Sequence, residues 1–511
     1  MTDWTDGYRT DIAYTYQYFP DLNPARISLA LAAAGLVPPK IKTACEIGFG
    51  HGVSVNVHAA ASDVKWWGTD FNPVQAAFAQ NISKSCALNS TLYDEAFADF
   101  ALRDDLPEFD YICLHGIWSW ISEKNRAIIV DFIRRKLAVG GVLYVSYNTN
   151  PGWAGFRPMR DLLAKYLTEQ SSTKSPIADR IEGALDFADR FLATNPTYLR
   201  NNPQVKQRIA QMRSQNRTYL AHEFFNEHWE PMSFADISSW LQPAKIQWAC
   251  SADMTEAFDP LHLTKDQQEL LRSIPDLTFQ QNLRDFMVNK SFRKDLWIKG
   301  IQKINPVERV EILREKKIIL TRQKKDIKYE VSTNLGKLTL KDAIYTPIID
   351  ALADYKPKTI GDLEKLFSKD KVNFGQITQA VMVLVGTGNA APVQDNWSEE
   401  ALKKGCTDLN NHICSKARGS SDLVNLASPV TGGGVFVSRI EQIFLLAKHQ
   451  DHEEPRDWAK FALKLLSEQG VTMRSGDRLL QNDGERIAHL TEMANAFLKQ
   501  RIPLLRALGI A

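Results

Sequence analysis

Apolar and polar positions alternate in a regular order along the first third of the chain. Short apolar runs, typical of buried strands, occupy 64–69, 109–114 and 142–146. Stretches with apolar positions three and four residues apart, typical of amphipathic helices, occupy 53–61 and 123–137. This alternation predicts an α/β fold with a doubly wound, Rossmann-like sheet, whose ligands lie at the carboxyl ends of the strands.

A glycine-rich turn follows the first predicted strand. In the segment Thr-Ala-Cys-Glu-Ile-Gly-Phe-Gly-His-Gly, the acid Glu46 is followed by Gly48, Gly50 and Gly52. Glycine is favoured where the backbone takes a positive φ or passes close to a ligand. The next predicted helix points its N-terminus at the same place. The segment therefore predicts a nucleoside-binding turn.

Acidic residues near this turn discriminate between cofactors. The second predicted strand ends at Asp70, where a carboxylate can accept hydrogen bonds from both hydroxyls of a ribose. Glu46 would repel the pyrophosphate of a dinucleotide but attract the ammonium and sulfonium groups of S-adenosylmethionine. We expect the third strand to end at Phe97-Ala-Asp99-Phe100, with an acid and an aromatic ring at the edge and face of an adenine. S-adenosylmethionine is therefore favoured over a dinucleotide.

These motifs resemble those of class I S-adenosylmethionine-dependent methyltransferases. In that family an acid-headed glycine turn, a ribose-binding acid and an adenine-binding acid hold the methyl donor. The resemblance implies cofactor-binding roles for Glu46, Gly48, Gly50, Gly52, Asp70 and Asp99. We add Phe100, as the aromatic ring at the adenine, and His115, at the end of the fourth strand. S-adenosylhomocysteine would be the product.

Further motifs are similar to one group of bacterial methyltransferases. They are Tyr14-x-Tyr-x-Tyr-Phe-Pro-x-Leu-Asn-Pro24, His115-Gly-Ile-Trp-Ser-Trp-Ile121 and Tyr147-Asn-Thr-Asn-Pro-Gly-Trp153. The segments 219–226 and 279–297 resemble the two ends of the group's methyltransferase regulatory domain. The group includes rickettsial protein-lysine methyltransferases that modify an outer-membrane protein. The resemblance implies a protein substrate, such as a surface or outer-membrane protein before its export.

Glycine, proline and polar breaks predict six regions. They are an N-terminal cap (1–35), a methyltransferase domain (36–156), a helical arm that could form a homodimer (157–216), a regulatory domain (217–326), a winged-helix-like module (327–395) and a helical C-terminal region (396–511). The third helix of the winged-helix-like module lies within 372–386, which contains no Lys or Arg. Contact with nucleic-acid phosphates needs basic residues. The composition of this helix therefore favours a role of the module in packing or protein docking over a role in binding nucleic acid.

Charge and cysteine content agree with a cytoplasmic enzyme. Lys and Arg total 62 and Asp and Glu total 60, so no global field favours nucleic acid or a membrane surface. The first residues are acidic and polar, unlike a signal peptide, and no apolar run reaches the roughly 20 residues of a membrane span. The six cysteines include no Cys-x-x-Cys pair, so we expect buried free thiols and no metal site.

An acceptor slot is predicted at the ends of the fourth and fifth strands. Methyl transfer needs a nucleophile roughly 3–3.5 Å from the methyl carbon and in line with the S–C bond. Burial and the nearby sulfonium lower the pKa of a lysine and so favour its neutral amine. We expect Trp118, Trp120 and Tyr147 to form the walls of this slot. His115 would accept a proton. Packing roles for the tryptophans and for His115 are equally compatible with the sequence.

Two other clusters have chemical and structural interpretations. Tyr14, Tyr16 and Tyr18 could close over the slot, although a packing role is favoured. His222 and Glu223 lack a third metal ligand at a suitable spacing, so a helix cap or a contact between domains is favoured.

Together these observations predict a methyltransferase that acts on lysine side chains of a protein. The long C-terminal extension offers a surface that a small acceptor would not need. The alternatives are a methyltransferase for a small molecule or glycan, and a protein that senses S-adenosylmethionine without turnover.

Overall fold

A seven-stranded mixed sheet forms the centre of the structure, a computed structural model that describes residues 5–10, 12, 14–172, 174–367 and 372–511. The strand order is β3-β2-β1-β4-β5-β7-β6. The strands are β1 (Thr43–Ile47), β2 (Lys65–Thr69), β3 (Ser90–Tyr93), β4 (Phe109–Leu114), β5 (Leu137–Asn148), β6 (Gln247–Ser251) and β7 (Phe292–Ile298). β1 to β5 are parallel, and β7 runs antiparallel between β5 and β6. This confirms the predicted α/β class and its doubly wound sheet.

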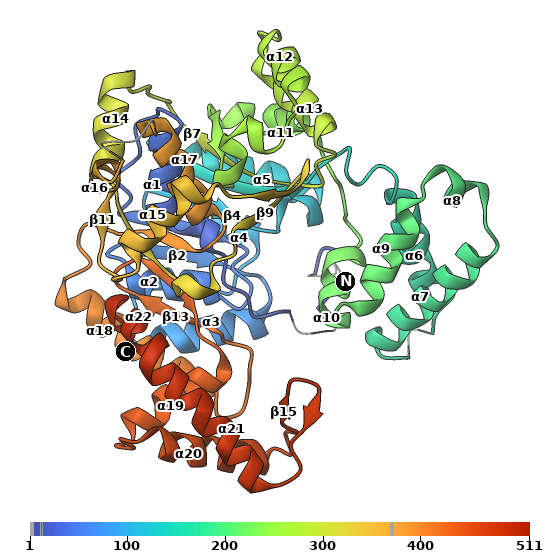
Figure 1. The fold of residues 1–511 in the computed structure, drawn as a ribbon. Helices are drawn as coiled ribbons and strands as arrows, with labels where there is room; N and C mark the ends of the chain where they lie inside the picture. The colour runs from blue at the N-terminus through green and yellow to red at the C-terminus, as the bar shows by residue number, and fades with distance from the viewer. Residues whose placement is uncertain (1–4, 11, 13, 173, 368–371) are drawn as a thin grey trace.

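Helices cover both faces of this sheet, which explains why its strands are continuously apolar (Figure 1). Ala44, Trp66 and Tyr144 pack on one face, and their chain neighbours Cys45, Trp67 and Val145 pack on the other. The first face is covered by α1 (Pro24–Ala33), α2 (Val53–Ala61) and α3 (Pro73–Ser85), and the second by α4 (Phe97–Ala101), α5 (Glu123–Lys136) and α11 (Phe234–Leu241).

The predicted end of the third strand is wrong. β3 ends at Tyr93, and the segment expected to finish the strand forms α4 instead. Phe97 and Phe100 are three residues apart, which is a helical spacing. Phe100 packs against Phe132 of α5, with ring centroids 5.5 Å apart. Tertiary packing therefore converts this short segment into a helix.

The regulatory region is part of the sheet rather than a separate unit. Between residues 217 and 299, its helices are α10 (Arg217–Phe224), α11, α12 (Lys265–Arg272) and α13 (Leu277–Met287). Its two strands, β6 and β7, extend the sheet beyond β5. The sheet is therefore not confined to residues 36–156.

A buried ionic network holds the regulatory region to the sheet. Arg293 on β7 donates to Asp285 Oδ1 at 2.7 Å and to Asp295 Oδ2 at 2.8 Å. The Tyr147 hydroxyl on β5 donates to the same Asp295 oxygen at 2.7 Å, and Trp248 Nε1 on β6 donates to Asp295 Oδ1 at 3.0 Å. Asp295 and Arg293 are almost fully buried, so each charge depends on its partners.

The predicted helical arm forms a lobe that stands apart from the sheet (Figure 1). It consists of α6 (Arg157–Glu169), α7 (Ile177–Ala193), α8 (Thr197–Asn201) and α9 (Gln204–Ser214). These helices share a core with α10 and with Trp120 of the loop after β4. The lobe is thus joined to the body through α10 and this loop.

The module predicted to resemble a winged helix contains its three helices but differs in its strands. The helices are α15 (Asp342–Leu352), α16 (Ile360–Lys365) and α17 (Phe374–Gly386). The hairpin of β9 (Glu330–Thr333) and β10 (Gly336–Thr339) precedes them. After α17 the single strand β12 (Ala390–Pro392) pairs with β8 (Lys317–Leu320), which also pairs with β11 (Lys358–Thr359). Within the described residues, no two-stranded wing follows α17.

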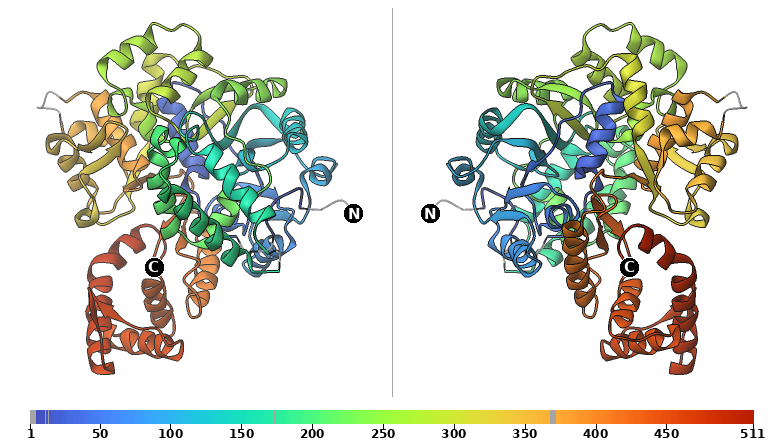
Figure 2. Two further views of the ribbon diagram at one scale, coloured as in Figure 1. Left: turned by 90° about the vertical axis from the view of Figure 1, so that its right-hand side faces the viewer. Right: turned by 90° about the vertical axis from the view of Figure 1, so that its left-hand side faces the viewer.

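The C-terminal region is mainly helical, as predicted, and projects from the body at the bottom of Figure 2. It contains α18 (Glu400–Lys416), β13 (Asn425–Ser428), β14 (Gly433–Phe436), α19 (Arg439–His449), α20 (Pro455–Glu468), β15 (Arg474–Ser475), β16 (Arg478–Leu479), α21 (Asp483–Ala496) and α22 (Ile502–Ala507). α14 (Pro306–Glu315) connects the sheet to β8. α18 packs on α2, and its Gly405 and Cys406 approach the carbonyl oxygen of Ala60 near the C-terminal end of α2.

All six cysteines are free, and only Cys250 is not fully buried. No helix in the described part of the chain has both the length and the apolar character needed to span a bilayer. Over the same residues, no cluster of three or more His, Cys, Asp or Glu has a metal-binding arrangement.

Candidate functional site

The glycine turn brings the end of β1 against the loop after β4. Gly48 has a φ of +72°, and a Cβ there would lie 2.4 Å from Ile117 Cδ1. Gly52 has a φ of +65°, and its Cβ would lie 2.5 Å from the Cβ of Ala79 on α3. Larger residues are therefore excluded at both positions, at Gly48 by the cavity wall and at Gly52 by helix packing.

Two carboxylates lie at the carboxyl ends of β1 and β2. Asp70 accepts hydrogen bonds from the backbone N–H of Gly50 at 2.8 Å and of Asn72 at 3.0 Å. Burial raises the pKa of Asp70 to about 7 despite these bonds. Glu46 Oε2 is buried and has no hydrogen-bond partner. Burial, reinforced by the charge of Asp70, raises the pKa of Glu46 to about 8. A bound cation would satisfy Glu46 and favour its ionised form.

A cavity of about 300 Å³ adjoins these carboxylates. Phe97, Ile117 and Ile121 form an apolar part of its wall, and Asp6, Lys124 and Asn125 also line the cavity. There Asp6 accepts hydrogen bonds from the Ser122 hydroxyl at 2.7 Å and from Asn125 Nδ2 at 2.8 Å, so the N-terminal segment covers this part of the cavity. The cavity therefore offers an apolar slot for a flat ring, then a pair of carboxylates.

The structure brings some of the predicted site residues together and separates others. Glu46, Gly48, Gly50, Asp70 and His115 line the cavity. Gly52, Asp99, Phe100, Trp118 and Tyr147 do not line it. Asp99 is exposed on α4 and Phe100 lies in the core, because the segment is helical. The side chains of this pair therefore do not line the cavity, and Ala96, Phe97 and Ala98 form the neighbouring part of its wall.

Two of the three aromatic residues that were predicted to form the walls of the acceptor slot, Trp118 and Tyr147, do not line the cavity. Trp118 is fully buried, and its Nε1 donates to Met232 Sδ at 3.4 Å in the core under the sheet. Tyr147 is also fully buried, with its hydroxyl committed to Asp295. Side chains in a strand alternate between the two faces, so a residue at the end of a strand need not point toward the ligand. Trp120 does line the cavity.

His115 forms a wall of the cavity rather than a basic group. Its Nδ1 lies 2.7 Å from the Tyr144 hydroxyl, and its ring lies against Phe19 with centroids 3.8 Å apart. Burial, with the charge of Lys294 acting in the same direction, lowers the pKa of His115 to about 3. The imidazole is therefore neutral near pH 7 and a weak proton acceptor.

The three N-terminal tyrosines have separate positions. Tyr14 lines the cavity opposite Gly50. Tyr16 stacks on His51 with centroids 4.0 Å apart, and Tyr18 packs beside His58 at 5.3 Å. Of the three, Tyr14 alone lines this cavity, whereas Tyr16 packs the N-terminal segment onto the glycine turn and α3, and Tyr18 packs it onto α2.

Some lining residues are not among the predicted site residues. Tyr8 and Gln75 reach the cavity from segments without a motif, and Phe19 belongs to the motif that starts at Tyr14. Ile117 and Ile121 lie within the motif that starts at His115. Their spacing of four residues is the feature of the sequence that indicates two apolar side chains on the same wall.

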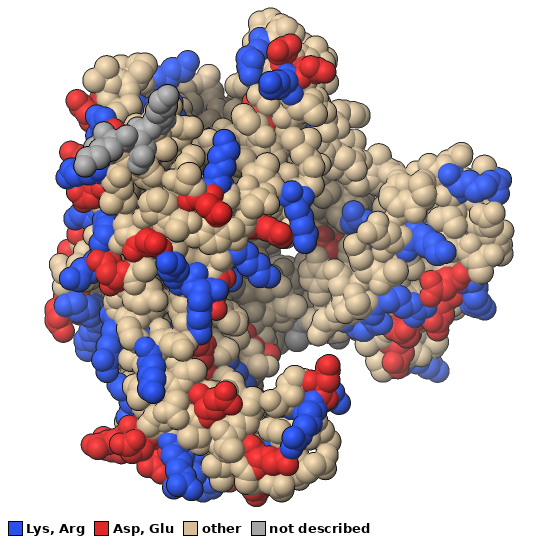
Figure 3. Space-filling view, in the orientation of Figure 1, with Lys and Arg blue, Asp and Glu red and all other residues tan. Residues whose placement is uncertain are grey.

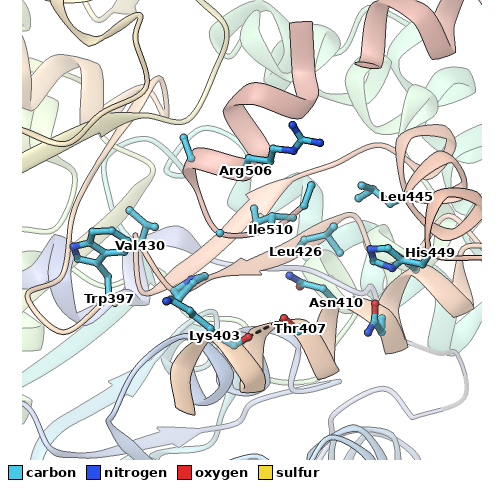
Figure 4. A pocket seen from close by; sticks show the side chains of 16 residues that line it. Trp397, Lys403, Thr407, Asn410, Leu426, Val430, Leu445, His449, Arg506 and Ile510 are labelled. Carbon is cyan, nitrogen blue, oxygen red and sulfur yellow. Dashed lines mark hydrogen bonds between the residues drawn. The ribbon is translucent and has the colours of Figure 1, made fainter. Parts of the chain in front are cut away.

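A second cavity, of about 440 Å³, lies in the C-terminal region (Figure 4). Lys403, Thr407 and Asn410 lie along α18 on one side, with Leu426 and Ile510 above them. It shares no lining residue with the first cavity and has no Asp or Glu in its wall. It therefore lacks the carboxylates that a ribose and an amine require.

Comparison with known proteins supplies the class. The family described as "Predicted methyltransferase regulatory domain" matches residues 216–299. The structure of PKMT2 from Rickettsia typhi in complex with AdoHcy is similar with a TM-score of 0.72 and 16% sequence identity, covering 97% of this chain and 99% of that chain. By its fold and its regulatory domain, the chain falls in the class of S-adenosylmethionine-dependent methyltransferases.

Relatives by sequence identify the family within this class. The uncharacterized protein sll1526 of Synechocystis sp. is 35% identical over 513 residues, which cover 99% of this chain and 100% of that protein. The chain belongs to the family of this cyanobacterial protein. The uncharacterized protein RP789 of Rickettsia prowazekii is 24% identical over 302 residues, or 58% of this chain and 53% of that protein.

Proposed function

We propose that the protein transfers a methyl group from S-adenosylmethionine to the ε-amine of lysine side chains in a protein substrate. The observation that carries the proposal is the cavity at the carboxyl ends of β1, β2 and β4. It combines an unsatisfied buried carboxylate, Glu46, with the backbone-held carboxylate of Asp70 and an apolar slot.

The residues present fit the methyl donor. Asp70 would accept from the two ribose hydroxyls, and Glu46 would bind the donor's ammonium group. The ring of Phe97 and the side chains of Ile117 and Ile121 would enclose the adenine. When bound, S-adenosylmethionine supplies a methyl group activated by a sulfonium. Apolar lining excludes water from that methyl group and orients the acceptor.

The extent of the structural similarity supports a protein acceptor. PKMT2 from Rickettsia typhi matches nearly the full chain, including the helical lobe and the C-terminal region. Figure 3 shows a hollow between the body, the helical lobe and the C-terminal helices, and Figure 1 places α10 at its edge. A hollow of this kind can admit a polypeptide segment, whereas a small acceptor would leave it largely unused. The helical lobe as a homodimer surface stays a prediction.

Transfer of label tests the proposal. The protein is incubated with methyl-labelled S-adenosylmethionine and host lysate, and labelled proteins are hydrolysed to amino acids. We expect label in methylated lysine, with no label when Asp70→Ala replaces the wild-type protein. Label confined to small molecules would contradict the protein acceptor. Donor binding without any transfer would show a sensor instead of an enzyme.

A further inference from the structure

Two polar side-chain atoms in the wall of the cavity beside Glu46 are buried and have no hydrogen-bond partner. Among the described residues that line this cavity, these atoms are Glu46 Oε2 and Gln75 Nε2. The first accepts hydrogen bonds, and the proposed function pairs it with the ammonium group of S-adenosylmethionine. The second is an amide nitrogen, which can only donate. Leaving a buried N–H group unpaired costs free energy, so its place in the wall of a ligand cavity indicates that a ligand atom is the missing partner.

Gln75 lies in the first turn of α3, which starts directly after Asp70. Asp70 Oδ1 accepts from the backbone N–H of Asn72 at 3.0 Å, and the side chain of Asn72 caps the helix. Gln75 is only 4% exposed. It lies one helical turn before Ala79, whose Cβ is 2.5 Å from the place that a Cβ of Gly52 would occupy. Helix capping and helix packing therefore fix Gln75 relative to both Asp70 and the glycine turn.

The side chains of Asp70 and Gln75 both end beside Gly50. The Gly50 N–H donates to Asp70 Oδ2 at 2.8 Å, and Gln75 Oε1 lies 3.9 Å from the place that a Cβ of Gly50 would occupy. The ring of Tyr14 approaches the same place to 3.3 Å. Rotation about the last side-chain bond of a glutamine exchanges the positions of its amide oxygen and nitrogen. A neighbouring carboxylate favours the orientation in which the amide N–H groups point toward it. The amide can therefore present a hydrogen-bond donor next to the carboxylate of Asp70.

We propose that Gln75 is a ribose-binding residue, which donates a hydrogen bond from Nε2 to one oxygen of the ribose diol of S-adenosylmethionine. A hydroxyl group has one proton to donate and two lone pairs that accept. Asp70 would accept the protons of the diol, and the amide of Gln75 would donate to one of its oxygens. This inference rests on the proposed function, because it takes Asp70 as the residue that holds the ribose.

The pair of Asp70 and Gln75 makes one ribose hydroxyl a determinant of specificity. That hydroxyl would donate to Asp70 and accept from Gln75. A ligand without it would leave both buried groups unpaired, and a site built to bind a hydroxyl discriminates strongly against an analogue that lacks it. Gln75 is thus expected to contribute to the preference for a ribose over a deoxyribose.

Binding of deoxyribose analogues tests the proposal. The probes are S-adenosylhomocysteine and its 2′-deoxy and 3′-deoxy analogues, each titrated into the full-length protein and followed by calorimetry. Gln75→Met keeps the length of the side chain and removes the amide. We expect this variant to bind S-adenosylhomocysteine about three- to tenfold more weakly than wild type, the range for one hydrogen bond between neutral groups. The analogue that lacks the partner hydroxyl should bind no more weakly to Gln75→Met than to wild type, whereas the other analogue should show the full loss. Asn81→Leu, at an exposed amide on the same helix, is the matched control and should bind all three probes like wild type.

Comparison of the three probes on one variant separates the hydrogen bond from an effect on packing, since altered packing would weaken all three alike. An affinity of Gln75→Met for S-adenosylhomocysteine equal to or above that of wild type would overturn the assignment. The same loss for all three probes would also overturn it, because the amide would then contact another part of the ligand, such as its carboxylate, or only support the fold. If Gln75→Met does not fold, Gln75→Ala with the same probes decides the matter. Failure of the wild type to bind S-adenosylhomocysteine would contradict the proposed function instead.

Discussion

The donor side and the acceptor side of the cavity are built in different ways. On the donor side, Glu46, Gly50 and Asp70 come from one continuous stretch of chain, and backbone hydrogen bonds hold them at the ends of adjacent parallel strands. On the side where we propose that the acceptor binds, Tyr8, Tyr14 and Trp120 come from the N-terminal segment and the loop after β4, and His222 of α10 packs against both tyrosines. The first side depends on local geometry, whereas the second depends on the packing of the regulatory region and the helical lobe against the sheet. Loss of that packing should therefore impair the acceptor side before the donor side.

The largest effect should follow from breaking the ionic network that holds the regulatory region. Asp295→Ala leaves the buried Arg293 without its main partner, so we expect the free energy of unfolding to fall by about 3–5 kcal/mol. Chemical denaturation measures this change. Asp104→Ala, an exposed acid before β4, should be within about 0.5 kcal/mol of wild type. Equal stability of the two variants would contradict the role of the network.

The next effect concerns the donor side alone. Asp70→Ala removes the acceptor for the ribose hydroxyls, so affinity for S-adenosylhomocysteine should fall by about 1–3 kcal/mol. Calorimetry on the folded variant measures the loss. An unchanged affinity would show that the ribose lies elsewhere.

A smaller effect should appear in the pH dependence of donor binding. The pKa of Glu46 is about 8 without ligand, so this group is mostly protonated at pH 7. A bound ammonium favours the ionised carboxylate, so binding should release up to about one proton at pH 7, and affinity should rise toward pH 8. Calorimetry in buffers of different ionisation enthalpy measures the released proton. Glu46→Gln should abolish this release, and any release that persists belongs to another group, such as Asp70.

The smallest expected effect concerns Asp99, a residue that the sequence motif predicts at the cofactor but that does not line the cavity in the structure. Asp99 was expected to hold the adenine, but it is exposed on α4 and does not line the cavity. Asp99→Ala should therefore change affinity for S-adenosylhomocysteine by less than about 0.5 kcal/mol. Fluorescence titration beside wild type is sufficient to measure it. A loss as large as that of Asp70→Ala would restore the original expectation.

Much of the donor side could be predicted because its signals are local. The strand-turn-helix at Gly48 and the acid at the end of β2 follow from turn chemistry and from the geometry of parallel strands. The error at Phe97–Phe100 arose because a short apolar segment is compatible with a strand or a helix until its packing partner, Phe132, is known. For Trp118 and Tyr147 the reason is different: their places after β4 and at the end of β5 follow from the sequence, but the direction of each side chain depends on tertiary packing, and both pack in the core.

By itself, the sequence determined the α/β class, the glycine turn and the paired carboxylates, since these depend on periodicity and on residues close together in the chain. Only the tertiary structure decided that β6 and β7 complete the sheet, that His115 is a neutral wall, and that Trp120 lines the cavity whereas Trp118 and Tyr147 are buried in the core. The physical reason is that burial and the charges around a group come from segments far apart in sequence, and these set its orientation and its pKa.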